Sequence, residues 1–251
     1  MTFKELHRQN SPLLLCNVWD VASAKVAEKL GFAAIGTSSA AIAAARGLAD
    51  GENLKFAELL QVVQQIKQHC QLPLTVDIES GYSREPQLIS EHIVSLNQLG
   101  VVGINIEDSV VNSQRELLPA EEFAATLSYI KQQLGQDQID MFINARSDVY
   151  LLGHKNALEL AQQRIRLYIE AGADGIFLPG IEQLDQIKTL SKTCSVPLNV
   201  MCMPQLANFT QLQSAGVQRI SMGNFLFANM QQHLESQLNS IKQTQSFASL
   251  F

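Results

Sequence analysis

The segment that decides the fold reads Leu72-Pro73-Leu74-Thr75-Val76-Asp77-Ile78-Glu79-Ser80-Gly81-Tyr82. A proline followed by apolar residues predicts a buried strand, and this strand ends in two carboxylates, Asp77 and Glu79. Side chains two residues apart on a strand point the same way, so a chain extended through Glu79 would aim both acids into one pocket. Two clustered carboxylates repel each other, and a hard divalent cation such as Mg²⁺ relieves the repulsion and accepts oxygen ligands.

Strands of this kind recur along the chain in two alternating forms. One form is proline-led or apolar and covers residues 12–17, 73–77, 141–146 and 197–201. The other begins with a glycine and covers residues 31–36, 100–105, 172–177 and 216–221. Helix-period segments separate them, at residues 20–30, 54–69, 86–99, 120–134, 154–171, 181–192, 205–215 and 223–240. The glycines fit the position just after a helix, where a positive φ ends it.

Eight strands that alternate with eight helices predict a single α/β domain over residues 1–251, a (β/α)₈ TIM barrel. The alternative is an open doubly wound sheet, which favours a glycine-rich first turn. The first turn of this chain is Asn17-Val18-Trp19-Asp20, which has no glycine. Residues 240–251 form a polar tail that ends in Phe247, Leu250 and Phe251, and this tail either docks on a partner subunit or frays.

The composition is that of a globular protein, with 46% hydrophobic and 17% charged residues. A net charge of −6 without a Lys/Arg block argues against a nucleic-acid partner. No apolar run reaches the roughly 18 residues of a membrane span, and no signal-peptide pattern begins the chain, so we expect a cytoplasmic protein without a membrane partner. The four cysteines lack metal-site spacing and are predicted to be reduced, with Cys202 in the core.

In a barrel of this type the active site forms at the carboxyl ends of the strands. The polar residues predicted there include Ser38, Ser39, Asp77, Glu79, Glu107, Asp108, Arg146, Asp148 and Asn199. Arg146 can hold a carboxylate in bidentate fashion, and Ser38 and Ser39 can bind a second carboxylate or a phosphonate with backbone N–H groups. A structural alternative is a ring of salt bridges at the barrel mouth.

Six short motifs are specific when taken together: Gly31-Phe-Ala-Ala-Ile-Gly-Thr-Ser-Ser39, Gly47-Leu-Ala-Asp50, Val76-Asp-Ile-Glu-Ser-Gly-Tyr82, Gly103-Ile-Asn-Ile-Glu-Asp108, Asn144-Ala-Arg-Ser-Asp148 and Ala171-Gly-Ala-Asp-Gly-Ile-Phe-Leu-Pro179. Through them the chain resembles the isocitrate lyase/phosphoenolpyruvate mutase superfamily over nearly its full length. The resemblance implies a Mg²⁺-dependent barrel (Mn²⁺ is an alternative) that makes or breaks C–C or P–C bonds beside a 2-oxo acid. It also implies a homodimer or homotetramer in which the last helix is exchanged between subunits.

The resemblance carries over to individual positions. It implies that Asp77, Glu79 and Glu107 hold the metal. It makes Asp50, Glu107 and Arg146 catalytic, and it places a substrate-binding turn at Ser38, Ser39 and Ala40. A lid-like loop at residues 109–119 is expected to close over the substrate, so Asn112 and Arg115, together with Asn199, are candidate substrate contacts.

The chain lacks two sets of motifs that known members of the superfamily carry, and their absence limits the reactions expected of it. The loop Asp108–Pro119 contains no Cys and no His, whereas isocitrate lyases carry a catalytic Cys there. The mutases' Lys-Thr-Asn loop and strand-six histidine are also absent. The chain therefore looks most like the phosphonomutase-like branch of the superfamily.

We therefore expect a Mg²⁺-dependent carbon–carbon lyase or decarboxylase that acts through a metal-stabilised enolate, with oxaloacetate or a methylmalate- or isocitrate-like acid as substrate. Loss of CO₂ needs no dedicated acid, whereas retro-aldol cleavage needs a base, for which Tyr82 or a metal-bound water is a candidate. The alternatives are a phosphonate P–C mutase or hydrolase and a non-catalytic 2-oxo acid binding protein.

Overall fold

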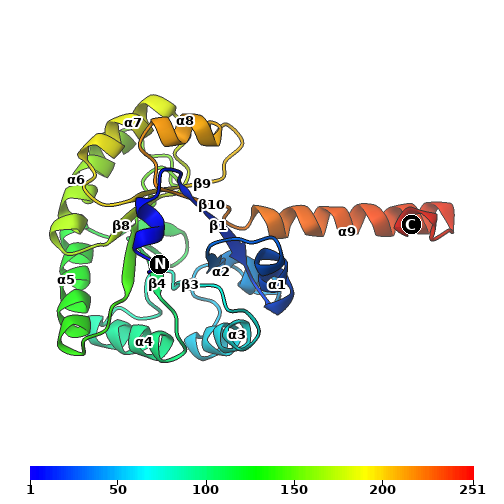
Figure 1. Ribbon diagram of the computed structural model, residues 1–251, viewed down its shortest axis with the longest axis horizontal. Helices are drawn as coiled ribbons and strands as arrows, with labels where there is room; N and C mark the ends of the chain where they lie inside the picture. The colour runs from blue at the N-terminus through cyan, green and yellow to red at the C-terminus, as the bar shows by residue number, and fades with distance from the viewer.

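The computed structural model describes residues 1–251 and contains a closed barrel of parallel strands, in the order β1-β10-β9-β8-β7-β4-β3-β2 (Figure 1). The strands are β1 (Leu13–Val18), β2 (Ile35–Thr37), β3 (Leu74–Asp77), β4 (Gly103–Glu107), β7 (Phe142–Arg146), β8 (Gly175–Leu178), β9 (Leu198–Met201) and β10 (Arg219–Ser221). All eight predicted strands are present, and the ring closes through parallel pairing of β1 with β10. The (β/α)₈ prediction is therefore confirmed, and the open-sheet alternative is excluded.

The helices alternate with the strands and lie around the barrel (Figure 1). They are α1 (Val21–Lys29), α2 (Ser39–Ala44), α3 (Phe56–His69), α4 (Pro86–Gln98), α5 (Ala120–Gln136), α6 (Ala157–Glu170), α7 (Leu184–Thr193), α8 (Phe209–Ser214) and α9 (Phe225–Thr244). Eight of these match predicted helices, with ends displaced by a few residues, and the short α2 was not predicted. Gly31, Gly100, Gly172 and Gly216 all have positive φ, as their positions after helices require.

The main core lies between the barrel and its helices. The five residues of β4 are all buried, as expected for a parallel strand covered on both faces. Helix α4 turns Ile89, Ile93 and Leu96 towards this core, at the spacing of one helical face. Burial of these faces fixes how the helices lie against the barrel, and it leaves the strand ends free for polar residues.

A second, smaller core closes the amino-terminal end of the barrel. The first residues form a 3₁₀ helix (Glu5–Arg8), and Phe3 and Leu6 pack with Leu15 and Phe142. Gly103 makes room for this plug, because a Cβ on it would lie 3.0 Å from Cε1 of Phe3. One end of the barrel is thus filled by apolar side chains.

The segment between β4 and α5 is a small antiparallel hairpin of β5 (Ser109–Val111) and β6 (Arg115–Leu117). The sequence predicted only a loop at 109–119. We call this hairpin the lid hairpin. Its base is tied to β4, since Leu118 N donates to Asp108 O at 2.8 Å.

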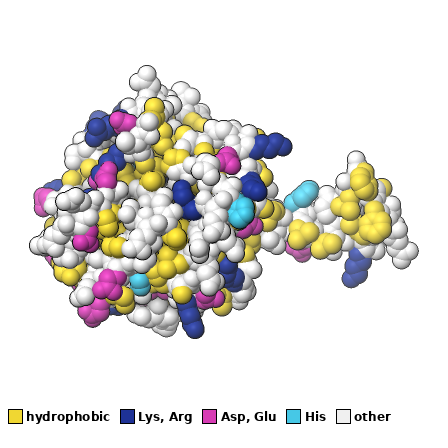
Figure 2. Space-filling view, turned by 60° about the horizontal axis from the view of Figure 1, so that its bottom comes forward, with side chains coloured by type: hydrophobic (Ala, Val, Ile, Leu, Met, Phe, Trp, Pro, Cys, Tyr) yellow, Lys and Arg dark blue, Asp and Glu magenta, His cyan; other side chains and the backbone are white.

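Helix α9 projects away from the barrel as an arm (Figure 1) and buries none of its residues. It runs to Thr244, and a short 3₁₀ helix (Ala248–Leu250) follows within the predicted tail 240–251. The arm carries hydrophobic side chains on its surface (Figure 2). None of the helices combines the length and the apolar composition needed to cross a membrane.

Candidate active site

Asp77 and Glu79 lie together at the end of β3, but not for the predicted reason. The strand ends at Asp77, and Glu79 adopts a left-handed backbone with φ 50°, so the chain is not extended through Glu79. The turn is closed by Gly81 N, which donates to Ile78 O at 2.8 Å. Glu79 N still donates to Asp77 Oδ1 at 3.3 Å. A tight turn rather than strand alternation therefore brings the two acids together.

The loop after β2 contributes the next residues. Ser38 caps α2, and its Oγ accepts a hydrogen bond from Ala41 N at 3.3 Å. Ser39 Oγ donates to Asp77 Oδ2 at 3.0 Å and lies 3.4 Å from Asp50 Oδ1. Ala40 is a half-buried residue of the same helix and offers no polar side chain. Ser39 thus connects two of the predicted acids, whereas the Ser38 side chain caps the helix that follows it.

On the other side of the site, Glu107 and Arg146 are register neighbours on β4 and β7. Arg146 Nη1 lies 2.8 Å from Glu107 Oε2. Its Nε and Nη2 donate to the two carboxylate oxygens of Asp148 at 2.6 and 3.2 Å. Asp148, two positions after Arg146 in the same motif, was predicted at this strand end but was given no role in the site. The arginine is held by two buried carboxylates in a fixed orientation.

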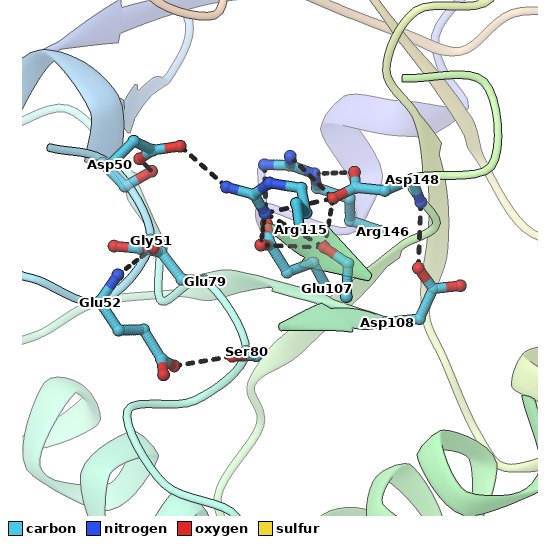
Figure 3. Close-up of polar contacts among 12 residues, drawn as sticks. Asp50, Gly51, Glu52, Glu79, Ser80, Glu107, Asp108, Arg115, Arg146 and Asp148 are labelled. Atoms are coloured by element: carbon cyan, nitrogen blue, oxygen red, sulfur yellow. Dashed lines mark hydrogen bonds and ion pairs between the residues drawn. The ribbon is translucent and has the colours of Figure 1, made fainter. Parts of the chain in front are cut away.

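Arg115 of the lid hairpin reaches into this group from above (Figure 3). Its Nη1 forms a short ion pair with Glu107 Oε1 and lies 3.3 Å from Asp148 Oδ2, and its Nη2 donates to Asp50 Oδ2 at 2.9 Å. Arg115 therefore joins the lid to the β2 side and to the β4–β7 side of the site at once. The lid hairpin covers the acids, and Glu107 is only 2% exposed.

Burial and mutual repulsion raise the pKa of several carboxyl groups in the site. Burial raises the pKa of Asp77, and the Asp50 charge adds to the effect. Burial raises the pKa of Glu79 to about 7, with further contributions from Asp50 and Asp77. Burial also raises the pKa of Glu107 well above its ordinary value, which Arg146 only partly offsets. The site therefore concentrates more negative charge than its arginines neutralise.

Two predicted substrate contacts lie apart from this cluster. Asn112 is exposed at the tip of the lid hairpin, where its N–H donates to Gln114 O. Asn199 is buried inside the barrel, accepts from Asn144 Nδ2 at 3.1 Å and donates to Ser221 Oγ at 3.2 Å. The expectation that Cys202 lies in the core is wrong, because this cysteine is exposed. It follows the last residue of β9, where the chain leaves the barrel wall.

A supporting network beneath the site was missed from the sequence. Asp108 is fully buried and accepts from Arg164 Nη1 at 2.8 Å and from Tyr168 Oη at 2.7 Å. Its other oxygen accepts from Asp148 N at 3.0 Å. Arg164 Nη2 donates to Leu118 O at 2.8 Å. This network fixes both the loop after β7 and the base of the lid hairpin.

The oxygen atoms of this site are of the type that a hard divalent cation prefers, because they belong to carboxylates and a hydroxyl group. No group of three or more His, Cys, Asp or Glu side chains is close enough together to hold a metal ion directly. With the lid hairpin closed, the Glu107 carboxylate is occupied by Arg115 and Arg146. The residues present fit a divalent cation that keeps several waters and binds through one or two carboxylates. Asp77 and Glu79 are the residues that would hold it.

The fold and this strand-end cluster define an enzyme of the superfamily that contains carbon–carbon lyases and phosphonomutases. The profile of the phosphoenolpyruvate phosphomutase family matches residues 3–242, and the chain belongs to this family. An uncharacterized protein of Mycobacterium tuberculosis is 36% identical over 89% of this chain and 82% of its own length. The oxaloacetate decarboxylase of Pseudomonas entomophila is 28% identical over 88% of this chain and 77% of its own length.

A solved structure shows the same likeness in three dimensions. A crystal structure from Burkholderia cenocepacia J2315, assigned provisionally as a phosphonomutase, superposes with a TM-score of 0.89 at 36% identity. The match covers 94% of this chain and 97% of that one. Lyases and mutases thus both occur among the relatives.

Proposed function

We propose that this protein is a Mg²⁺-dependent carbon–carbon lyase that decarboxylates oxaloacetate or a closely related 2-oxo dicarboxylate. The observation that carries the proposal is the pair Arg115 and Arg146, which meet at Glu107 under a closed lid. Two guanidinium groups match the two carboxylates of such a substrate. The 28% identical relative named oxaloacetate decarboxylase supports this choice of substrate.

The two arginines have different tasks. Arg146 is held on both sides by Glu107 and Asp148, so it offers a fixed positive charge at the end of β7. Arg115 lies on the lid hairpin. Its contacts to Asp50 and Glu107 connect the hairpin to the loop after α2 and to the end of β4. A substrate carboxylate can replace these contacts when the lid opens and closes again. Arg115 is therefore the residue that exchanges partners during substrate entry.

Asp77 and Glu79 would hold the metal, and Ser39 Oγ orients Asp77 by donating to its Oδ2. A bound divalent cation would supply positive charge to the oxygen of the 2-oxo group. Tyr82 is a poor candidate for the base of a retro-aldol reaction, because its hydroxyl donates to Glu79 Oε1 at 3.3 Å. Burial, together with the Glu79 charge, raises the pKa of its hydroxyl, which therefore stays protonated at physiological pH. This favours decarboxylation over a reaction that must remove a hydroxyl proton.

The test is the formation of pyruvate from oxaloacetate, coupled to lactate dehydrogenase, with added Mg²⁺ and with a chelator. Because oxaloacetate also loses CO₂ slowly without enzyme, rates are referred to the same mixture without protein. We expect turnover that stops with the chelator and falls at least about 100-fold in D77N, since the metal loses a charged holder. Turnover that persists with the chelator, or in D77N, would refute the metal assignment.

A phosphonate reaction is the second candidate, because the 36% identical solved structure was assigned provisionally as a phosphonomutase. The same protein is incubated with phosphonopyruvate and followed by ³¹P NMR. Conversion of the phosphonate, with no pyruvate formed from oxaloacetate, would replace the decarboxylase proposal. Tight 2-oxo acid binding without any turnover would instead support a binding protein.

We further propose that α9 pairs with a second copy of this chain in a homodimer or homotetramer. Leu226, Met230, Leu234 and Leu238 are exposed at four-residue spacing and form one apolar stripe along the arm. An apolar hollow lined by Trp19, Val26, Leu226 and Met230 lies where the arm leaves the barrel. Phe227 packs on Trp19 of its own chain, but no residue of α9 is buried, so the rest of this helix gains stability by packing on another chain.

A further inference from the structure

Two loops beside the proposed metal site hold unusual backbone conformations. Residues 47–55 follow α2, and residues 78–85 follow β3. Within them Glu52 (φ 60°), Glu79 (φ 50°) and Tyr82 (φ 58°) are left-handed although none is glycine. Such residues are uncommon, and they persist where the surrounding contacts over-determine them.

Glu52 makes most of these contacts (Figure 3). Its Oε1 accepts from Ser80 Oγ at 2.8 Å and from Tyr82 N at 2.6 Å, and its Oε2 accepts from Arg84 Nη2 at 2.7 Å. Its backbone N–H donates to Glu79 Oε2 at 2.5 Å. The side chain thus holds the loop after β3, while the main chain of the same residue binds the carboxylate of Glu79.

The loop that carries Glu52 is itself held firmly. Asp50 accepts from Arg115 Nη2 at 2.9 Å. Gly51 lies directly against the lid hairpin, since a Cβ on it would be 2.7 Å from Cγ2 of Val111. Its φ of 99° also excludes other residues. With the lid hairpin closed, Glu52 is therefore held between that hairpin on one side and Glu79 on the other.

We propose that Glu52 is a positioning residue that sets the orientation of the Glu79 carboxylate, and through it the affinity of the site for Mg²⁺. The proposal rests on the proposed function, because that function makes Glu79 a metal-holding residue. Hydrogen-bond partners of metal-binding carboxylates fix the direction of their lone pairs, and displacing such a partner lowers metal affinity about 10- to 100-fold. The partner of Glu79 is the Glu52 N–H, and the Glu52 carboxylate keeps that N–H in place through its bonds to the loop after β3. Glu52 needs no contact with the metal or the substrate to act in this way.

Three variants separate positioning from general stability. E52G keeps the backbone N–H and the left-handed conformation but removes the carboxylate. E52Q keeps an oxygen that accepts from Ser80 and Tyr82. Q138G is the matched control, since Gln138 (φ 56°) is also left-handed but lies in the loop after α5. We expect Mg²⁺ affinity, measured by isothermal titration calorimetry, to fall about 10- to 100-fold in E52G. E52Q should recover most of the loss, and Q138G should leave the affinity unchanged.

Hydrogen exchange measured by mass spectrometry tests the same contacts without metal. Amides of residues 79–84 should exchange faster in E52G than in wild type and Q138G. Wild-type protein that binds no Mg²⁺ would refute the metal proposal, and the exchange data would then decide the role of Glu52 alone. Equal Mg²⁺ affinity in E52G and a metal-binding wild type would overturn the inference, as would unchanged exchange at 79–84.

Discussion

Replacing Arg164 by methionine should destabilise the protein strongly, because Arg164 neutralises a buried carboxylate. The side chain of Asp108 is 0% exposed and that of Arg164 is 8% exposed, and their ion pair measures 2.8 Å. In R164M, Tyr168 Oη and Asp148 N still donate to Asp108. The charge itself, however, has no counter-ion in the network.

Removing one partner of a buried ion pair costs about 3–5 kcal/mol, since it leaves an uncompensated buried charge. For a chain of this size each kcal/mol lowers the melting temperature by about 2–4 °C, so R164M should melt about 6–20 °C below wild type. The double variant D108N/R164M removes both charges of this pair and should recover most of this loss. Non-additivity of this kind is expected for two residues in direct contact.

Thermal unfolding followed by circular dichroism measures these differences at one pH and one protein concentration. R166M is the control, because Arg166 is an exposed arginine on the same helix α6. Its melting temperature should stay close to that of wild type. A loss below about 1 kcal/mol in R164M, the range typical of a surface pair, would refute the reasoning. A double variant as unstable as the sum of the two single variants would refute it too.

Three other predictions follow from the same structure. Burial lowers the pKa of His7 to about 3, helped by Arg219, so the unfolded chain binds more protons below pH 6.5. The free energy of unfolding should therefore fall by about 1.4 kcal/mol per pH unit between pH 6.5 and 3. Urea denaturation at pH 7 and pH 5 should show a smaller drop in H7Q, and equal drops would exclude His7 as the cause. R115A should raise the KM for oxaloacetate about 10-fold or more, because charge-assisted hydrogen bonds to a carboxylate are lost, and should speed proteolysis within residues 109–117. An unchanged KM would remove Arg115 from the substrate site. L234E/L238E places two charges on the apolar stripe of α9, so light scattering should give the mass of one chain, 27.7 kDa, whereas wild type gives a multiple of it. A variant mass equal to that of wild type would mean that the stripe is not the interface.

The barrel could be predicted because its signals are local. Each glycine after a helix and each short apolar run marks one element regardless of the rest of the chain, as Gly100 and β4 illustrate. Helix α2 also carried a local signal, since Ser38 is an N-cap before the alanine-rich run Ala40–Ala44. The same serine also fits a substrate-binding turn, and that interpretation hides the helix that Ser38 caps.

The internal arrangement of the site could be predicted only in part. Chain order places Asp77, Glu107 and Arg146 at neighbouring strand ends, and the structure brings them together. The left-handed turn at Glu79 depends on contacts from residues 27 positions earlier in the chain, which no local pattern reveals. The same holds for Arg115, whose partners Asp50 and Asp148 lie 65 and 33 positions away. The sequence therefore places residues 109–119 near the site, but it does not predict which residues Arg115 contacts.

The closure of the barrel has a consequence for how the protein is made. Asn17 at the end of β1 accepts a hydrogen bond from Met222 N, which lies 205 positions later in the chain. Strand β1 therefore has no partner on that side until the ribosome has reached Met222, 205 positions later. At roughly 5–20 residues per second, this edge stays open for about 10–40 s of synthesis. Strand edges that wait unpaired can associate with other chains. Expression at lower temperature, or with more chaperone, should consequently increase the yield of folded protein more than it would for a protein built from local contacts.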